Sequence, residues 1–199
     1  MAQTISYELT RAWAYRRISH RRMWIYTRAL PLVLTTVVGF LWLALPEKPN
    51  LVGGQSISSS ALAIIATLPG FYFAGLAAVA TFGGSGMDKI MPAPAPTLKT
   101  AVSNGIIDNE LSNRQFLSYL FSYLVFVSFV LCIILLIFSN FGQSIELLRK
   151  SAESIETYGK VGWLFLSAAT SLAVLSLAAS MIISTLHAVF FLTEKIHQP

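Results

Sequence analysis

The side chains best suited to chemistry lie on one face of the last apolar run, residues 161–192. Ser176, Ser180 and Ser184 recur every four residues, and His187 follows three residues later. This spacing places all four on one side of an α-helix. Histidine changes its charge near neutral pH, and serine hydroxyls donate and accept hydrogen bonds. Such a polar stripe faces other helices or an aqueous path, so two interpretations stay open: interhelical hydrogen bonding and the lining of a pore.

No catalytic or metal-binding pattern accompanies the stripe. The sequence has no His, Cys, Asp and Glu cluster at metal-ligand spacing, and no acidic residue near a Ser and His pair to support nucleophilic catalysis. The interiors of the apolar runs lack the Asp, Glu, Lys or Arg that proton-coupled carriers and voltage sensors use. The sequence therefore predicts a protein that is not an enzyme, with no cofactor and no metal.

Four long apolar runs position these side chains. The chain is 55% hydrophobic and 12% charged, whereas soluble domains carry about 25% charged residues. A helix that crosses a membrane needs about 20 apolar residues. We predict an all-α integral membrane protein whose single domain, residues 25–199, holds four transmembrane helices at residues 25–45, 61–82, 116–138 and 161–192. The last run has 32 uncharged residues, and we expect the other helices to be organised around it.

A basic segment precedes the first run. Residues 1–24 interleave arginines with aromatic side chains, a combination suited to the membrane surface. We predict an interfacial helix that continues into the first span and binds anionic lipid or a soluble protein, with direct nucleic-acid binding disfavoured. Together with two lysines of a later loop, the predicted partner-binding and lipid-binding residues are Arg11, Arg16, Arg17, Arg21, Arg22, Arg28, Lys89 and Lys99.

The second run carries a stripe of small side chains. These recur every three or four residues and predict a face for close helix packing, within the chain or between copies in a homo-oligomer; they are Ala63, Ala66, Gly70, Ala74 and Ala78. Pro69 in mid-span predicts a kink. A hinge or gate at this kink is the alternative function for the segment.

Two connections show local patterns. In the loop at residues 83–115, Asn104-Gly105 between apolar runs predicts a small β-hairpin. Ser112 and Gln115 predict a capping box at the start of the third run. Apolar spacing over residues 145–158 predicts an amphipathic helix between the third and fourth spans.

Ten of the 14 Lys and Arg residues fall on the side of the termini and hairpin. This bias places both termini and the hairpin in the cytoplasm and the amphipathic helix outside.

The layout resembles that of small four-span bacterial membrane proteins from anti-phage defence loci, such as the membrane subunit of Kiwa. Residues 70–82, 87–92 and 114–120 also resemble a pattern that recurs in uncharacterised bacterial proteins. The resemblance implies an oligomeric inner-membrane sensor or scaffold that recruits a soluble cytoplasmic partner, and it carries over no catalytic residue. The alternatives are a pore-forming or membrane-disrupting effector and an accessory or immunity membrane protein.

Overall fold

The computed structural model describes residues 11–46, 51–53, 56–81, 85–102, 105–154 and 156–195. Most of the described residues are helical. Within the described residues, four helices are long and apolar enough to cross a membrane: Ile25–Ala44, Ile57–Thr81, Asn113–Asn140 and Tyr158–Thr193. Each overlaps one of the four predicted runs. The prediction of four helices with membrane-spanning length and composition is therefore confirmed.

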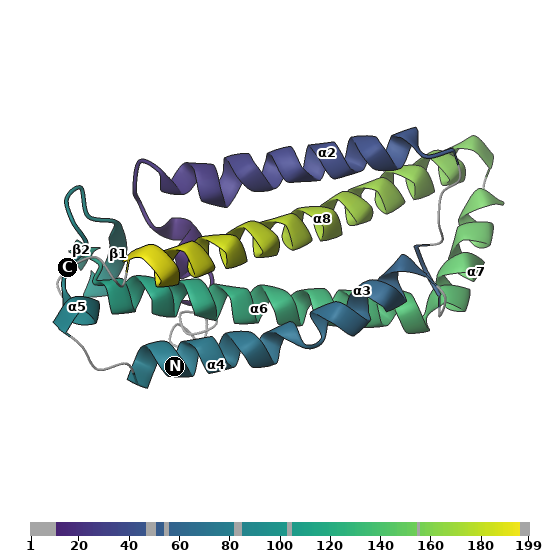
Figure 1. Cartoon of the computed structure of the whole chain (residues 1–199). Coiled ribbons are helices and arrows are strands. Elements are labelled where there is room, and N and C mark those ends of the chain that lie inside the picture. Colours follow the sequence, from purple (N-terminus) through teal and green to yellow (C-terminus); the bar gives the residue numbers. More distant parts are fainter. Residues whose placement is uncertain are drawn as a thin grey trace.

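The four spans lie roughly alongside one another (Figure 1). In chain order they are built from η2 (Ile25–Ala29) with α2 (Leu30–Ala44), α3 (Ile57–Ile65) with α4 (Leu68–Thr81), α6 (Asn113–Asn140), and α8 (Glu156–Phe190) with η3 (Phe191–Lys195). Helices α3 and α4 pack along one side of α6, α8 contacts another side, and α2 packs on α8. The central helix is thus α6, and the last run, which we expected to organise the fold, is less enclosed.

The second span is broken where the sequence places Pro69. Helix α3 ends at Ile65 and α4 begins at Leu68. Proline has no N–H to donate to the carbonyl four residues earlier, which belongs to Ile65, and its ring crowds that carbonyl. The predicted kink is therefore confirmed as a break between two helices.

A β-hairpin closes one end of the bundle, called the hairpin end below (Figure 1). Strands β1 (Thr97–Val102) and β2 (Gly105–Glu110) pair antiparallel, from Thr97 opposite Glu110 to Val102 opposite Gly105. This confirms the predicted hairpin, although Ser103 and Asn104, where the sequence predicts the turn, lie outside the described residues. The predicted capping box is also confirmed: the Gln115 backbone N–H donates to Ser112 Oγ over 3.3 Å, and the Ser112 N–H donates to Gln115 Oε1 over 3.2 Å.

The amphipathic helix α7 (Gly142–Glu153) lies at the opposite end, the α7 end, between α6 and α8. It begins three residues earlier than predicted and ends earlier, because residues 156–158 already belong to α8. The loop after the first span folds back here: the Gly53 N–H donates to the Phe138 carbonyl over 3.0 Å. A Cβ added to Gly142 would lie 2.8 Å from Gly53 Cα, and Gly53 has a φ of 108°. Both positions therefore require glycine.

The described part of the basic N-terminal segment differs from its prediction. Residues 11–24 are here called the strap. They contain a short 3₁₀ turn, η1 (Ala14–Arg17), followed by the extended Ile18, and only Met23 and Trp24 are helical in continuity with η2. Ser19 then pairs with Thr97 of β1. The prediction of one continuous interfacial helix is therefore wrong for residues 12–22, whereas residues 1–10 of the predicted helix lie outside the described residues. The physical reason is that the hairpin holds Ser19 in an extended conformation, while apolar strap side chains are buried against the bundle.

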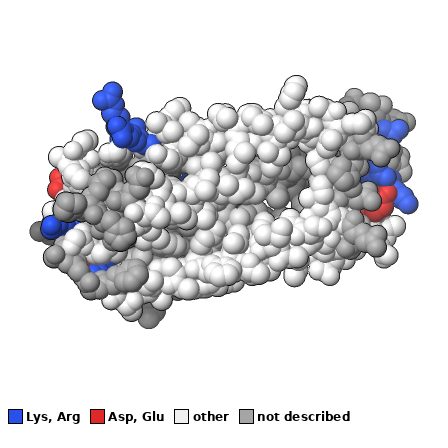
Figure 2. All heavy atoms as spheres, in the orientation of Figure 1, with Lys and Arg blue, Asp and Glu red and all other residues white. Residues whose placement is uncertain are grey.

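Charged side chains gather at the two ends, and the broad visible face between them carries none (Figure 2). The core follows α6, where five aliphatic side chains are fully enclosed together with Tyr123 and Ser128: Leu117, Leu120, Leu124, Val127 and Leu131. By contrast, many large apolar side chains of α2 and of the first half of α8 are exposed. In a membrane, that exposed apolar surface faces hydrocarbon, which solvates it as well as a protein interior does.

Candidate functional site

The strap enters the bundle through two aromatic side chains. The Tyr15 side chain is fully buried, and its ring centroid lies 5.3 Å from that of Tyr123 and 6.1 Å from that of Phe116 on α6. Trp13 meets Tyr123 edge-on at 5.5 Å and Phe126 at 5.7 Å. Aromatic pairs of this kind contribute about 0.5–1.5 kcal/mol each beyond the burial of their area. The strap is therefore a packed part of the bundle.

Tyr15 also joins the strap to the last span through His187. The Tyr15 hydroxyl lies 3.0 Å from His187 Nδ1, and the tautomer of the histidine decides which of the two donates. The His187 ring stacks on Tyr26 of the first span, with centroids 4.2 Å apart and planes 15° from parallel. Burial raises the pKa of Tyr15, while the nearby Ser184 hydroxyl acts in the opposite direction, so the phenol stays neutral at physiological pH.

The polar stripe of the last span divides into two parts. Ser180 and Ser184 are buried, and the Ser180 and Tyr123 hydroxyls are 2.7 Å apart. His187 is half-buried in the cluster just described, whereas Ser176 is exposed on the surface of α8. Within one chain, the stripe therefore contacts α6 and the strap over its C-terminal half. A pore lined by this stripe in an assembly of several copies stays a prediction.

Tyrosine side chains of the bundle are the functional candidates that the sequence reasoning missed. Besides Tyr15 and Tyr123, Tyr72 of α4 donates to Thr185 Oγ1 of α8 over 2.7 Å, since Thr185 itself donates to the Met181 carbonyl. A buried tyrosine hydroxyl requires a hydrogen-bond partner. Tyrosines inside apolar runs that also contain Ser, Thr or His were the signal that could have revealed these contacts.

A pair of backbone hydrogen bonds joins the strap to the hairpin. The Ser19 N–H donates to the Thr97 carbonyl over 2.8 Å, and the Thr97 N–H donates to the Ser19 carbonyl over 3.1 Å. The flanking arginines of the strap are exposed beside this junction, and they are Arg16, Arg17, Arg21 and Arg22. None of Arg17, Arg21 and Arg22 forms an ion pair with another described residue. We call these four arginines the basic surface.

The other predicted binding residues have different surroundings. Lys89 and Arg28 are exposed near the hairpin end, and Lys99 is exposed on β1 opposite Asp108 of β2. Arg11 instead lies over the Tyr119 ring, 5.2 Å from its centroid, and donates to the Tyr119 hydroxyl. A cation placed over an aromatic ring stabilises that contact. Arg11 thus fastens the strap to α6.

An ion pair fixes the base of the hairpin. Arg114 Nε donates to Asp88 Oδ1 over 2.7 Å, and the same guanidinium donates to the Val79 and Ala80 carbonyls over 3.0 and 3.1 Å. It therefore satisfies carbonyls at the C-terminal end of α4 while holding α5 (Ser85–Asp88). The hydrogen bond from Arg114 lowers the pKa of Asp88. The ends of α4 and α6 are tied together beneath the hairpin.

The predicted stripe of small side chains lies away from the interhelical contacts of this chain. Ala63, Ala66, Gly70 and Ala74 are exposed and Ala78 is half-buried. The close approach of α4 to α6 occurs at Gly75, where an added Cβ would lie 2.6 Å from the Phe121 ring. The stripe is therefore not the packing face within one chain. Packing of the stripe against a second copy stays a prediction.

Comparison with known proteins adds no relative. No protein family model matches the chain, and neither a curated protein nor a solved structure matches it. The resemblance to the Kiwa membrane subunit accordingly stays a prediction, and the function is argued from the geometry of the hairpin end.

Proposed function

We propose that this protein is a non-enzymatic, oligomeric inner-membrane scaffold that recruits a soluble partner through the basic surface and the hairpin. The observation that carries this proposal is the Ser19–Thr97 backbone pairing. It fixes four exposed arginines beside an exposed hairpin, so that two segments distant in sequence form one rigid surface. The partner chemistry that matches this surface is an acidic segment, because guanidinium groups bind carboxylates through paired hydrogen bonds.

The proposed side of the membrane follows from charge. Ten Lys and Arg residues belong to the segments of the hairpin end and four to those of the α7 end. Loops rich in Lys and Arg stay in the cytoplasm. The proposal therefore places the hairpin end in the cytoplasm, where a soluble partner has access to the basic surface.

The test of recruitment uses an arginine variant in neutral-lipid nanodiscs. Neutral lipid removes anionic headgroups, which would otherwise compete for the arginines. Replacing Arg16, Arg17, Arg21 and Arg22 by Gln should abolish recovery of a bound soluble protein while leaving insertion and melting temperature unchanged. The matched control replaces Arg149, Lys150 and Lys160 at the α7 end by Gln and should retain the partner. Equal recovery by both variants would refute the assignment of the docking surface.

A labelling experiment tests the sidedness separately. In a Cys132→Ser background, Asn109→Cys places a thiol on exposed β2 and Ser151→Cys places one on exposed α7. A membrane-impermeant maleimide applied to spheroplasts should label Cys at position 151 immediately and Cys at position 109 only after permeabilisation. The reverse order of labelling would place the basic surface outside and remove a cytoplasmic partner from consideration.

A further inference from the structure

The hairpin has one strand edge that the strap covers only in part. Successive residues of a β-strand direct their backbone N–H and C=O groups to alternate edges. Thr97 of β1 exchanges both of its backbone hydrogen bonds with Ser19 of the strap. By this alternation, Lys99 and Ala101 direct their N–H and C=O groups to the same edge, away from β2. The strap therefore begins a third strand, and β1 continues beyond it.

The strap leaves this edge because Tyr15 is buried in the bundle. A third strand that continued from Ser19 would run opposite Lys99, but the strap instead forms the turn η1, which carries Tyr15 toward α6. Within the described residues, no backbone hydrogen bond joins Lys99 or Ala101 to another segment at this edge. Each residue has one N–H and one C=O group. Both pairs of groups are therefore open to an added strand.

The two edges of the hairpin differ in charge. The edge strand β1 carries exposed Lys99 and lies beside the basic surface, whose arginines flank Ser19. The other edge strand, β2, carries exposed Asp108 and Glu110. Side chains directly opposite one another on adjacent strands have Cβ atoms about 4.5–5.5 Å apart, and like charges there are destabilising. An acidic strand is therefore favoured beside β1 and disfavoured beside β2.

The two faces of β1 define the side chains that an added strand needs. Lys99 is exposed on one face, whereas Leu98 on the other face is buried in the core. Side chains of paired strands share these faces, so an added strand has every second side chain on the face of Lys99 and the others on the face of Leu98. A strand with acidic residues on the first face and apolar residues on the second matches this edge.

A second copy of the hairpin matches the edge less well. Pairing of two β1 edges would bring both basic surfaces and both Lys99 side chains together, and like charges oppose this. Pairing of β1 with β2 of another copy would set successive hairpins about 10 Å apart, because strands are spaced about 4.8 Å. A bundle two helices wide measures about 20 Å, so the bundles would collide. The edge therefore suits an extended segment of a separate protein.

We infer that the soluble partner adds an extended, acidic β-strand to the edge of β1, antiparallel to it as the strap is. Its backbone pairs with Lys99 and Ala101, and its carboxylates lie beside Lys99 and the basic surface. This inference rests on the proposed function, because it states how the recruited partner is held. In this mode of recognition the main-chain hydrogen bonds supply affinity, and the alternating side chains supply specificity.

The test measures binding of a fluorescent peptide to the full chain in neutral-lipid nanodiscs by fluorescence anisotropy. The probe has eight residues, alternating glutamate and valine, which is an ordinary strand length. In antiparallel pairing, residues on the face of Lys99 direct their N–H groups to β1, so those N–H groups belong to the glutamates. N-methylation of the glutamate amides should weaken binding roughly 30-fold, the effect of two backbone hydrogen bonds.

The matched control peptide carries the same number of N-methyl groups on its valine amides. Those amides face away from β1, so this analogue should bind as the unmodified probe does. The two analogues have the same composition and charge, and they differ only in which backbone edge is blocked. Equal binding of the two analogues, or weaker binding of the valine analogue alone, would overturn the inference. Failure of the unmodified probe to bind would overturn it as well.

Two proline variants of the chain test the edge itself. Ala101→Pro removes an N–H from the open edge of β1, and Ile106→Pro at the opposed position removes one from the outer edge of β2. Proline is tolerated where the N–H faces away from the sheet, so both variants should keep the hairpin and the melting temperature. Ala101→Pro should weaken probe binding about tenfold, whereas Ile106→Pro should bind as wild type does. The reverse order would place the partner on β2 and overturn the inference.

The inference and the proposed function fail in different measurements. If wild type recovers a soluble protein but binds both peptide analogues equally, recruitment works by charge alone and strand addition is refuted. If wild type recovers no soluble protein, the proposed function fails whatever the peptides do. A lower oligomer mass for Ala101→Pro than for Ile106→Pro would assign the edge to a second copy and also overturn the inference.

Discussion

The helices α6 and α8 are the two longest membrane-spanning elements among the described residues, yet the fraction of each that is buried inside the protein differs greatly. In the most apolar stretch of α6, 44% of the residues are buried and the mean hydropathy is 3.0. The corresponding stretch of α8 has 17% buried and a mean hydropathy of 2.0. Helix α6 is packed by α4, by the strap and by part of α8, whereas the first half of α8 faces outward.

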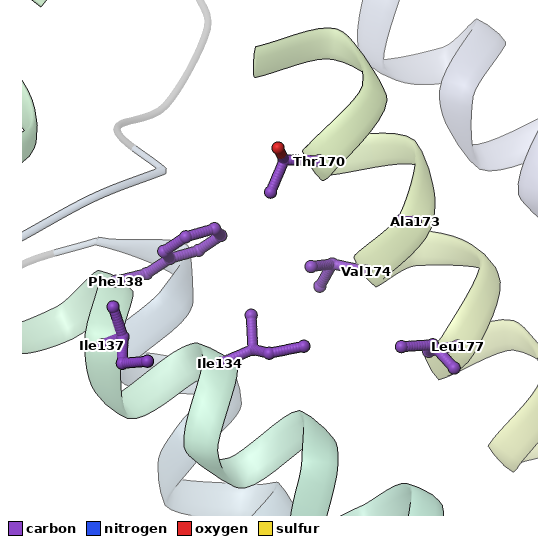
Figure 3. A pocket seen from close by; sticks show the side chains of 7 residues that line it. All are labelled: Ile134, Ile137, Phe138, Thr170, Ala173, Val174 and Leu177. Atoms are coloured by element: carbon purple, nitrogen blue, oxygen red, sulfur yellow. The ribbon is translucent and has the colours of Figure 1, made fainter. Parts of the chain in front are cut away.

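The difference shows that packing partners, and not length, decide which helix is central. Lipid tails are as apolar as leucine, so an apolar helix gains little by exchanging lipid for protein unless the surfaces interlock. The partners of α6 interlock with it through Tyr15 of the strap and Gly75 of α4. Helix α8 interlocks with α6 toward the hairpin end, and toward the α7 end an apolar gap separates Ile134 and Phe138 of α6 from Val174 of α8 (Figure 3).

The largest expected effect comes from removing the side chain that links both helices to the strap. Tyr15→Ala should lower the free energy of unfolding by about 3 kcal/mol, because it empties a fully enclosed aromatic site between α6 and α8. The measurements are thermal melting in nanodiscs and the rate of tryptic cleavage at the strap arginines, which should rise. Tyr158→Ala is the control, since Tyr158 is 88% exposed and its removal should change the free energy by less than about 0.5 kcal/mol. Equal melting and cleavage for the two variants would show that the strap does not hold the helices together.

A smaller effect distinguishes the face of α4 that packs on α6 from the opposite face. Gly75→Ala should cost about 1–3 kcal/mol, because the new Cβ forces the buried Phe121 ring to move. Gly70→Ala has open space around its Cβ and should be neutral, or stabilising by up to about 1 kcal/mol through helix propensity. Thermal melting of the two variants in the same detergent checks this. If Gly70→Ala is destabilising, the small-residue stripe packs against another helix. Because this face of α4 has open space within one chain, that helix would belong to a second copy.

The smallest effect concerns pH at the base of the hairpin. Arg114 lowers the pKa of Asp88 below its ordinary value of 3.8, so the folded state holds this proton less tightly than the unfolded state does. The resulting stabilisation is present above about pH 4 and is lost as the pH falls through the lowered pKa. Asp88→Asn should therefore flatten the acid limb of a melting-temperature profile between about pH 5 and pH 3. The pair is exposed, so solvent screening keeps the effect small.

Elements with local causes could be predicted from the sequence. The four spans follow from uncharged runs, the break in the second span from Pro69, and the start of α6 from the Ser112 capping box. The hairpin follows from its Asn-Gly turn sequence and flanking apolar residues. Each of these signals acts within a few residues of the structure that it causes.

Relations between elements could not be predicted in the same way. Helix α4 is apolar all round, so spacing alone could not decide whether the face of Gly70 or the face of Gly75 meets α6. The buried position of Tyr15 depends on His187, 172 residues later in the chain, and no local pattern encodes that distance. The arginines of the strap indicated a binding role from the sequence alone. Their position beside the hairpin could not be predicted, because it depends on the Ser19–Thr97 pairing between segments distant in sequence.

The 172-residue separation between Tyr15 and His187 also sets the order in which the protein can be built. Ribosomes add about 5–20 residues per second, so roughly 10–30 seconds pass between the synthesis of the two partners. During that interval the first span can already be in the bilayer, while the strap has neither its histidine nor, at first, its hairpin. The arginines that later flank the docked strap are thus free during biogenesis to hold the N-terminal segment on its side of the membrane, and the strap takes its final place only when the last helix has been inserted.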